Sequence, residues 1–240
     1  MSSGPRTGGR SRSTQLIVLA VLGAVLLVVA AIVISQSGSD DDDGTSGAAA
    51  GGQSAAAVDA VEGLPQSGDT LGEPDAPFTI VEFGDLQCPF CGQFGRNEVP
   101  KLIEGPVAAG DANLQFRNWA ILGPDSETAA AAALAAGEQN RMWSFVEAFY
   151  ADQGEENSGY VTDEFLRQIA ETAGVPDLER WESDRDPSRW TAELSDVDAQ
   201  ATELGFTGTP SFAIVGPQGT TPLPNASTAD QIEQALAAAG

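Results

Sequence analysis

The strongest hydrophobic pattern in the chain is an unbroken apolar run over residues 16–34, in which no side chain is polar. A helix of about 20 apolar residues spans the hydrocarbon core of a bilayer. The run therefore predicts one transmembrane helix over residues 15–35. A cleaved signal peptide is the alternative, but the run is longer than a usual signal core and no small-residue cleavage pattern directly follows it.

Charges on the two sides of this run predict its orientation. Arg6, Arg10 and Arg12 precede the run, whereas residues 40–43 are all Asp. Basic flanks stay in the cytoplasm. We therefore expect residues 1–14 to be cytoplasmic and the rest of the chain to lie outside the cell membrane, held by a single-pass anchor.

The segment over residues 36–67 shows no helical or strand periodicity. It consists mainly of Ser, Gly, Asp and Ala, which bury too little apolar surface to offset the entropy lost on ordering. We predict a disordered, acidic linker rich in Gly, Ser and Ala. A dimerisation stalk would need heptad or strand periodicity, which we do not find, so we expect a monomer.

Beyond residue 67 the pattern alternates between strands and helices. Short apolar runs at 78–83, 113–119 and 211–215 predict strands, and the first of these is apolar enough to be central in a sheet. Residues between the second and third runs show helical periodicity, and a last helix is expected near residues 229–239.

Capping signals and apolar stripes place helices in the block between the strands. Asp125 or Ser126 is expected to cap the first helix and Thr162 a later one. Two stripes at helical spacing predict core faces, and they consist of Met142, Phe145, Val146, Phe149 and Tyr150, and of Trp190, Leu194, Val197, Ala201 and Leu204. The order of elements predicts an α/β fold for residues 68–240, with an inserted helical subdomain at about 125–204 and parallel strand pairs in the sheet.

Composition narrows the chemistry. The chain has 240 residues, 35 acidic against 11 basic side chains, two Cys and no His. The net charge of -24 disfavours binding to nucleic acid, which is itself a polyanion. Without His and with only two Cys, we expect neither a metal site nor another cofactor.

Both cysteines lie in the stretch CPFC, just after the first predicted strand. We expect Cys88 to be the N-cap of a helix and Pro89 its first residue. The free N–H groups of Phe90 and Cys91, together with the helix dipole, should then lower the pKa of Cys88. Cys91 lies one turn later, where it can resolve a mixed disulfide formed by Cys88.

Three other interpretations of the pair are weaker. A static disulfide across three residues closes a very small loop and stabilises little. A zinc ion shared between two molecules would need ligands from both. A haem attachment site would need His after the second Cys, where Gly92 stands.

The segments VEFGDLQCPFCGQF and GTPSFAIVG together resemble the thioredoxin-fold disulfide oxidoreductases of the DsbA type, particularly their membrane-tethered bacterial members. The resemblance covers residues 72–240. It implies a thioredoxin-like fold with the helical insertion, and catalysis of disulfide formation or exchange. Cys88 would be the attacking thiol and Cys91 the resolving thiol.

The resemblance also assigns three further residues. Glu82 matches the buried acid that exchanges protons with the resolving thiol, although an edge-strand carboxylate facing water is an alternative. Thr209 and Pro210 match the cis-proline loop, which lies beside the Cys pair and contacts extended substrates. Phe90 departs from the most oxidising members, which have His there; it is expected either to contact clients or to pack on its own helix.

We therefore predict an extracytoplasmic, membrane-anchored thiol-disulfide oxidoreductase. It would act on exported proteins with free cysteines and depend on a membrane redox partner that the sequence does not identify. A reductase or isomerase would use the same chemistry in another direction, and a non-catalytic peptide-binding module would carry a silent disulfide.

Overall fold

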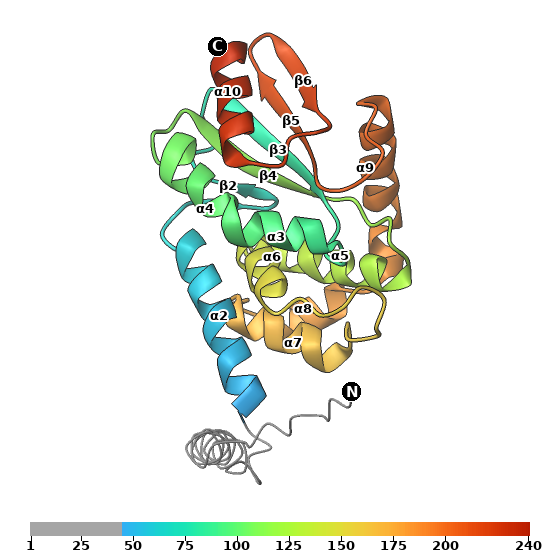
Figure 1. The fold of residues 1–240 in the computed structure, drawn as a ribbon. Helices are drawn as coiled ribbons and strands as arrows, with labels where there is room; N and C mark the ends of the chain where they lie inside the picture. The colour runs from blue at the N-terminus through green and yellow to red at the C-terminus, as the bar shows by residue number, and fades with distance from the viewer. Residues whose placement is uncertain (1–44) are drawn as a thin grey trace, which may run out of the picture. The chain divides into compact units, whose positions relative to one another are not determined.

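The computed structural model describes residues 45–240, with side chains from residue 53 onward (Figure 1). Six strands form one sheet in the order β1-β2-β4-β3-β5-β6. The strands are β1 (Gln66–Ser67), β2 (Thr70–Leu71), β3 (Phe78–Gly84), β4 (Ala112–Asn118), β5 (Ser211–Gly216) and β6 (Gly219–Leu223). The helices are α2 (Thr45–Val61), α3 (Pro89–Asn97), α4 (Val99–Leu102), η1 (Ile103–Val107), α5 (Pro124–Gly137), α6 (Met142–Ala151), α7 (Asp163–Thr172), α8 (Leu178–Asp184), η2 (Pro187–Trp190), α9 (Thr191–Glu203) and α10 (Ala229–Ala239).

The three strands predicted from apolar runs form the middle of the sheet. β3 lies between β4, to which it is parallel, and β5, to which it is antiparallel. The remaining pairings are antiparallel, so the predicted parallel arrangement holds for one pair of strands. The three strands without an apolar run, β1, β2 and β6, complete the edges and were not predicted.

Alternation along β3 divides the core into two layers. Ile80 belongs to the large apolar cluster that includes buried residues of α3, α4, α6 and α10. Val81 and Phe83 belong to a smaller cluster with Val197 and Ala201 of α9. Glu82 is two residues after Ile80 on β3, so both side chains point to the face of the sheet that α3 and α6 cover.

The helical insertion between β4 and β5 runs from α5 to α9. Thr162 caps α7 as predicted, because its side chain accepts a hydrogen bond from the N–H of Phe165. The cap of α5 is different: Gly123 is the N-cap, and no side chain makes a capping hydrogen bond. The predicted caps Asp125 and Ser126 lie inside the first turn of this helix, after Pro124.

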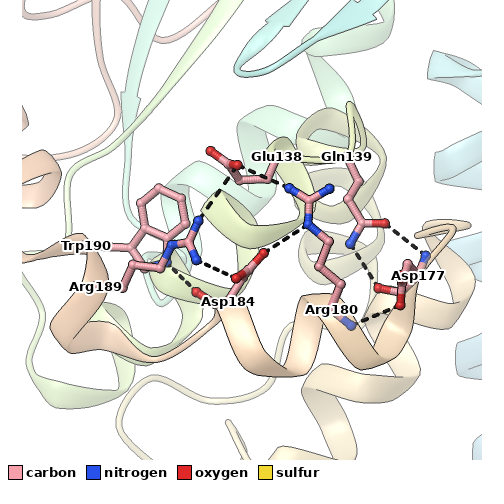
Figure 2. A network of polar contacts seen from close by, with 7 residues as sticks. All are labelled: Glu138, Gln139, Asp177, Arg180, Asp184, Arg189 and Trp190. Atoms are coloured by element: carbon pink, nitrogen blue, oxygen red, sulfur yellow. Dashed lines mark hydrogen bonds and ion pairs between the residues drawn. The ribbon is translucent and has the colours of Figure 1, made fainter.

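A polar network joins α8 and η2 to the end of α5 (Figure 2). Arg180 pairs with Glu138 at 3.4 Å and with Asp184 at 3.3 Å. Arg189 also pairs with both carboxylates, and the Trp190 ring N–H donates to the Asp184 carbonyl oxygen. Asp184 is buried and receives both guanidinium groups, so it is the centre of the network.

The predicted linker over residues 36–67 is wrong from Thr45 onward. Residues 45–61 form α2, and Gln66–Ser67 is β1. Alanine has the highest helix propensity, and burial of Val58 and Val61 in the main core holds the end of this helix. The composition of this segment did not reveal that Val58 and Val61 pack into the main core.

The predicted transmembrane helix lies outside the described residues. Within residues 45–240, no helix is both long enough and apolar enough to cross a bilayer.

Candidate active site

The two cysteines lie where β3 ends and α3 begins. Cys88 is the N-cap of α3, in extended backbone conformation, and Pro89 is the first helical residue, as predicted. The Cys88 N–H donates to the Asp85 carbonyl oxygen at 3.0 Å, and the Gly92 N–H donates to the Cys88 carbonyl oxygen at 3.1 Å. These bonds fix the Cys88 sulfur at the amino end of the helix.

The two sulfurs differ in access to solvent. Both cysteines are free thiols; Cys88 retains 4% of its surface exposed, whereas Cys91 is fully enclosed at 0%. The Cys88 Sγ lies 3.4 Å from the Thr209 carbonyl oxygen. The Thr209-Pro210 peptide bond is cis. The fold thus brings the Cys pair and the predicted loop together, although they are far apart in the sequence.

The pKa of Cys88 is lowered from 9.0 to about 6. The largest cause is a hydrogen bond from the Cys91 thiol; burial opposes it, and the Thr209 side chain and the N–H groups of Cys91 and Phe90 lower the pKa further. The Cys88 side chain makes no capping hydrogen bond to the helix N–H groups. These N–H groups therefore lower the pKa of Cys88 less than the Cys91 thiol does. The direction agrees with the sequence argument, but the neighbouring thiol contributes more than the helix end.

The pKa of Cys91 is shifted in the opposite direction. Burial raises its pKa well above the ordinary value, and the hydrogen bond to Cys88 and the charges of Cys88 and Glu82 raise it further. At neutral pH, therefore, Cys88 is a thiolate while Cys91 remains a thiol. Thiol-disulfide exchange uses such a split, because the thiolate is the attacking and leaving species.

Glu82 lies in the middle of the sheet beneath the Cys pair. Its neighbours in register are Phe116 on β4 and Phe212 on β5. The residue is only 4% exposed, which excludes the edge-strand alternative. Burial raises the pKa of Glu82 well above the ordinary value, and the charges of Glu147 and Cys88 raise it further.

Phe90 is 67% exposed at the surface, where it lines a groove. The alternative in which it packs on its own helix is therefore wrong. The groove has a volume of about 630 Å³ and runs between α3, the cis-proline loop and the segment before α10. Its lining includes Phe90, Phe94, Thr209, Pro210, Pro224 and Ala226.

Comparison with known proteins now gives the family. Residues 66–236 match a protein family described as thioredoxin. The chain belongs to this thioredoxin family. It is also 31% identical over 150 residues to a probable disulfide bond formation protein D of Bacillus cereus, covering 61% of this chain and 69% of that protein.

Solved structures agree with this assignment. A thioredoxin-like oxidoreductase from Silicibacter pomeroyi is 32% identical, with a TM-score of 0.59 over 71% of this chain and 90% of that one. BdbD from Bacillus subtilis has the same fold at 24% identity, with a TM-score of 0.63 over 74% of this chain and 96% of that one. The prediction of a DsbA-like thioredoxin-fold thiol-disulfide oxidoreductase is confirmed.

Sequence analysis missed three polar residues that support the site of this thioredoxin-family chain. Both oxygens of the buried Asp85 carboxylate accept backbone N–H groups, from Gln87 at 2.8 Å and from Ile121 and Leu122 at 2.8 and 3.0 Å. Its position directly after a strand was the available signal. The carboxylate ties the Cys-containing loop to the start of the helical insertion.

The other two missed residues come from α6 and its end. Gln153 donates from its side-chain amide to the carbonyl oxygens of Leu86 at 2.8 Å and Cys88 at 3.0 Å, and no sequence pattern indicated it. Glu147 is a buried acid in a helix whose neighbouring residues are apolar. That lone charge among core positions was a signal, and the apolar stripe obscured it.

Across residues 45–240, no group of three or more Cys, His, Asp or Glu side chains is arranged to hold a metal ion.

Proposed function

We propose that this protein catalyses disulfide formation in exported proteins with free cysteines, using the Cys88–Cys91 pair of its CPFC segment. A client thiolate attacks the Cys88 sulfur of the oxidised enzyme, which breaks the Cys88–Cys91 bond and releases Cys91 as a thiolate. A second client thiolate then attacks the client sulfur of the mixed disulfide. The client leaves with a disulfide, and the enzyme retains the two electrons as two reduced cysteines.

The observation that carries this proposal is the difference between the two sulfurs. Cys88 has a lowered pKa, keeps some exposure and lies at the cis-proline loop, whereas Cys91 is enclosed and has a raised pKa. A client can therefore reach only Cys88, and Cys91 is held one turn behind it to serve as the resolving thiol.

Oxidation of clients is the favoured direction because the reduced form is stabilised. A thiolate held below its ordinary pKa makes the reduced enzyme more stable and the disulfide correspondingly more oxidising. Equilibration of the pair with glutathione distinguishes the directions. An equilibrium constant that strongly favours the reduced enzyme supports the oxidant, and one that favours the disulfide supports a reductase or isomerase.

Clients are proposed to bind along the groove beside Cys88. Phe90 would offer an apolar contact, and Thr209 and Pro210 would offer backbone groups to an extended peptide. Replacing Phe90 by Ser should raise KM for a client peptide and leave kcat nearly unchanged. Ile121→Ser is the matched control, because Ile121 is also an exposed apolar residue, at 40%, and does not line the groove.

The proposed location is the outer side of the cell membrane, with residues 15–35 as a single-pass anchor and residues 1–14 in the cytoplasm. The apolar run and its basic amino-terminal flank support this orientation. Each client oxidation leaves two electrons on the enzyme, so turnover requires a membrane redox partner that accepts them.

The deciding experiment incubates the oxidised full chain with a reduced two-cysteine peptide. We expect rapid bridge formation by the wild type and none above background by Cys88→Ser. Reduced Cys91→Ala, given the same peptide with its two cysteines already joined, should form a mixed disulfide through Cys88 and release the second peptide thiol, and no Cys91 thiol is present to resolve it. If the wild type is no faster than Cys88→Ser, the chain is a binding module with a silent disulfide and the proposal is refuted.

A further inference from the structure

Two buried acids lie on the same side of the sheet in this domain. Glu82 on β3 and Glu147 on α6 are each 4% exposed. In each of them the Oε1 atom is enclosed and has no hydrogen-bond partner within the described part of the chain. An ionised carboxylate in such surroundings is costly, so each group favours its protonated form.

Glu147 reaches the Cys-bearing helix at a glycine. A β-carbon at Gly95 would lie 3.6 Å from Glu147 Oε1 and 2.9 Å from Tyr150 Cδ2, so α3 and α6 are in close contact there. Gly95 is one helical turn after Cys91 and lies on the same face of α3. Glu147 therefore lies one turn from the resolving thiol.

Glu82 and Glu147 interact with each other. After burial, the charge of Glu147 is the largest cause that raises the pKa of Glu82. Cys88, Cys91 and Tyr150 are the other titratable groups that interact with Glu82. The two carboxyl groups thus respond to each other within the same enclosed region.

Glu147 is the member of the pair that lies next to a surface cation. Arg96, on the exposed side of α3, donates to the carbonyl oxygen of Tyr150. Its positive charge lowers the pKa of Glu147 against the larger effect of burial, and the pKa is about 8. Glu147 is therefore protonated at neutral pH, and a carboxylate formed there is stabilised by the positive charge of Arg96.

We propose that Glu147 passes protons between Glu82 and the solvent at Arg96 during each disulfide exchange. The inference rests on the proposed function and deepens it. Glu147 acts on the sulfurs only through Glu82, so it is a positioning residue and not a catalytic one.

The steps balance without any further redox reagent. When a client thiolate attacks Cys88, the released Cys91 thiolate takes a proton from the Glu82 carboxyl. The Glu82 carboxylate takes a proton from the Glu147 carboxyl, and the Glu147 carboxylate, beside Arg96, takes one from water. Reoxidation moves the proton in reverse, from the Cys91 thiol through Glu82 and Glu147 to water.

The first test measures single-turnover oxidation of a reduced two-cysteine peptide by the oxidised full chain from pH 5.5 to 9.5. General acid-base steps contribute about 10²- to 10⁴-fold, and partial loss of one relay member should slow Glu147→Gln about tenfold near pH 6.5. The ratio of wild-type to Glu147→Gln rates should fall towards one above the pKa of Glu147, because the wild type then also lacks that proton.

Two comparisons separate a relay from a structural effect. The control is Ser144→Ala, a fully buried change one turn earlier on α6, which should leave the ratio flat with pH. The double variant Glu82→Gln/Glu147→Gln should be no slower than Glu82→Gln alone, because residues acting in series are not additive. A pH-independent ratio, or rate losses that multiply in the double variant, overturns the inference.

A second variant tests proton transfer between Glu147 and solvent at Arg96 without changing a buried residue. Arg96→Gln should raise the pKa of Glu147, observed by NMR of ¹³C-labelled glutamate carboxyls. It should also shift the midpoint of the rate ratio upward by the same amount. An unchanged Glu147 titration overturns the role of Arg96. If wild type and Cys88→Ser are equally slow, the proposed function fails; if Cys88 is required but Glu147→Gln behaves like Ser144→Ala, only the relay fails.

Discussion

Replacement of Cys91 should raise the pKa of Cys88. The lowering of that pKa from 9.0 to about 6 corresponds to about 4 kcal/mol in favour of the thiolate, at 1.36 kcal/mol per pKa unit. At pH 7 such a group is about 90% ionised, whereas a group at the ordinary value is about 1% ionised.

Cys91→Ala removes the largest of the favourable contributions and leaves those of Thr209 and the two backbone N–H groups. The thiolate still pays for burial, which is the second largest influence. We therefore expect the pKa of Cys88 to rise by at least about one unit, which at pH 6 lowers the thiolate fraction from about 50% to about 9%.

The assay is ultraviolet absorbance of the thiolate against pH, checked by the rate of alkylation with iodoacetamide. In Cys91→Ala the only remaining sulfhydryl is Cys88, so the titration has one component. Thr209→Val is the companion variant and should cause a smaller rise, because its hydrogen bond ranks below that of Cys91. A pKa still near 6 in Cys91→Ala would refute the assignment of the hydrogen bond.

Three further predictions concern stability, each measured by urea unfolding of the full chain. The pKa of Glu147 is raised from 4.5 to about 8 in the folded state, so protonated Glu147 contributes its full stability below pH 4.5 and loses it as pH rises through 8. The stability of Glu147→Gln relative to the wild type should therefore increase between about pH 5 and 8, by at most about 5 kcal/mol. A stability difference that does not change with pH would contradict this. Gly95→Ala should destabilise the folded protein by about 1–3 kcal/mol, because its β-carbon would lie 2.9 Å from the Tyr150 ring. The control Gly208→Ala should have little effect, because the space around Gly208 is open. Equal losses in the two variants would show that the contact between α3 and α6 is not the cause. Asp184→Ala should cost about 1–2 kcal/mol, because it removes the buried one of the two carboxylates that Arg180 and Arg189 share, while Glu138 still pairs with both. A loss below about 0.5 kcal/mol would show that the network behaves as exposed surface pairs do.

The middle of the fold could be predicted because its signals are local. Apolar runs located β3, β4 and β5, and the Pro after Cys88 located the start of α3. The edges could not: β6 has an exposed, polar sequence that pairs only because β5 offers an open edge. Likewise α2 is held by two valines whose partners are far away in the sequence.

The site was predictable for residues that carry a motif and not for those that support it. The two cysteines, Glu82 and the cis-proline loop all belong to contiguous segments. Glu147 on α6 and Gln153, just after the end of α6, approach the cysteines from a part of the chain that only tertiary packing brings close. The pKa of Cys88 shows the same division: its direction follows from helix position, while its main cause is the orientation of one neighbouring thiol.

The bonds from Gln153 and Asp85 have a consequence for protein engineering. Excising the helical block to obtain a minimal redox scaffold would remove the amide that supports the Leu86 and Cys88 carbonyls. It would also remove the backbone donors of Ile121 and Leu122 if the cut began at β4. The segment between β4 and β5 thus supplies hydrogen bonds that hold the Cys-containing loop in place. A shortened protein would need other donors in their place before its cysteines could be oriented.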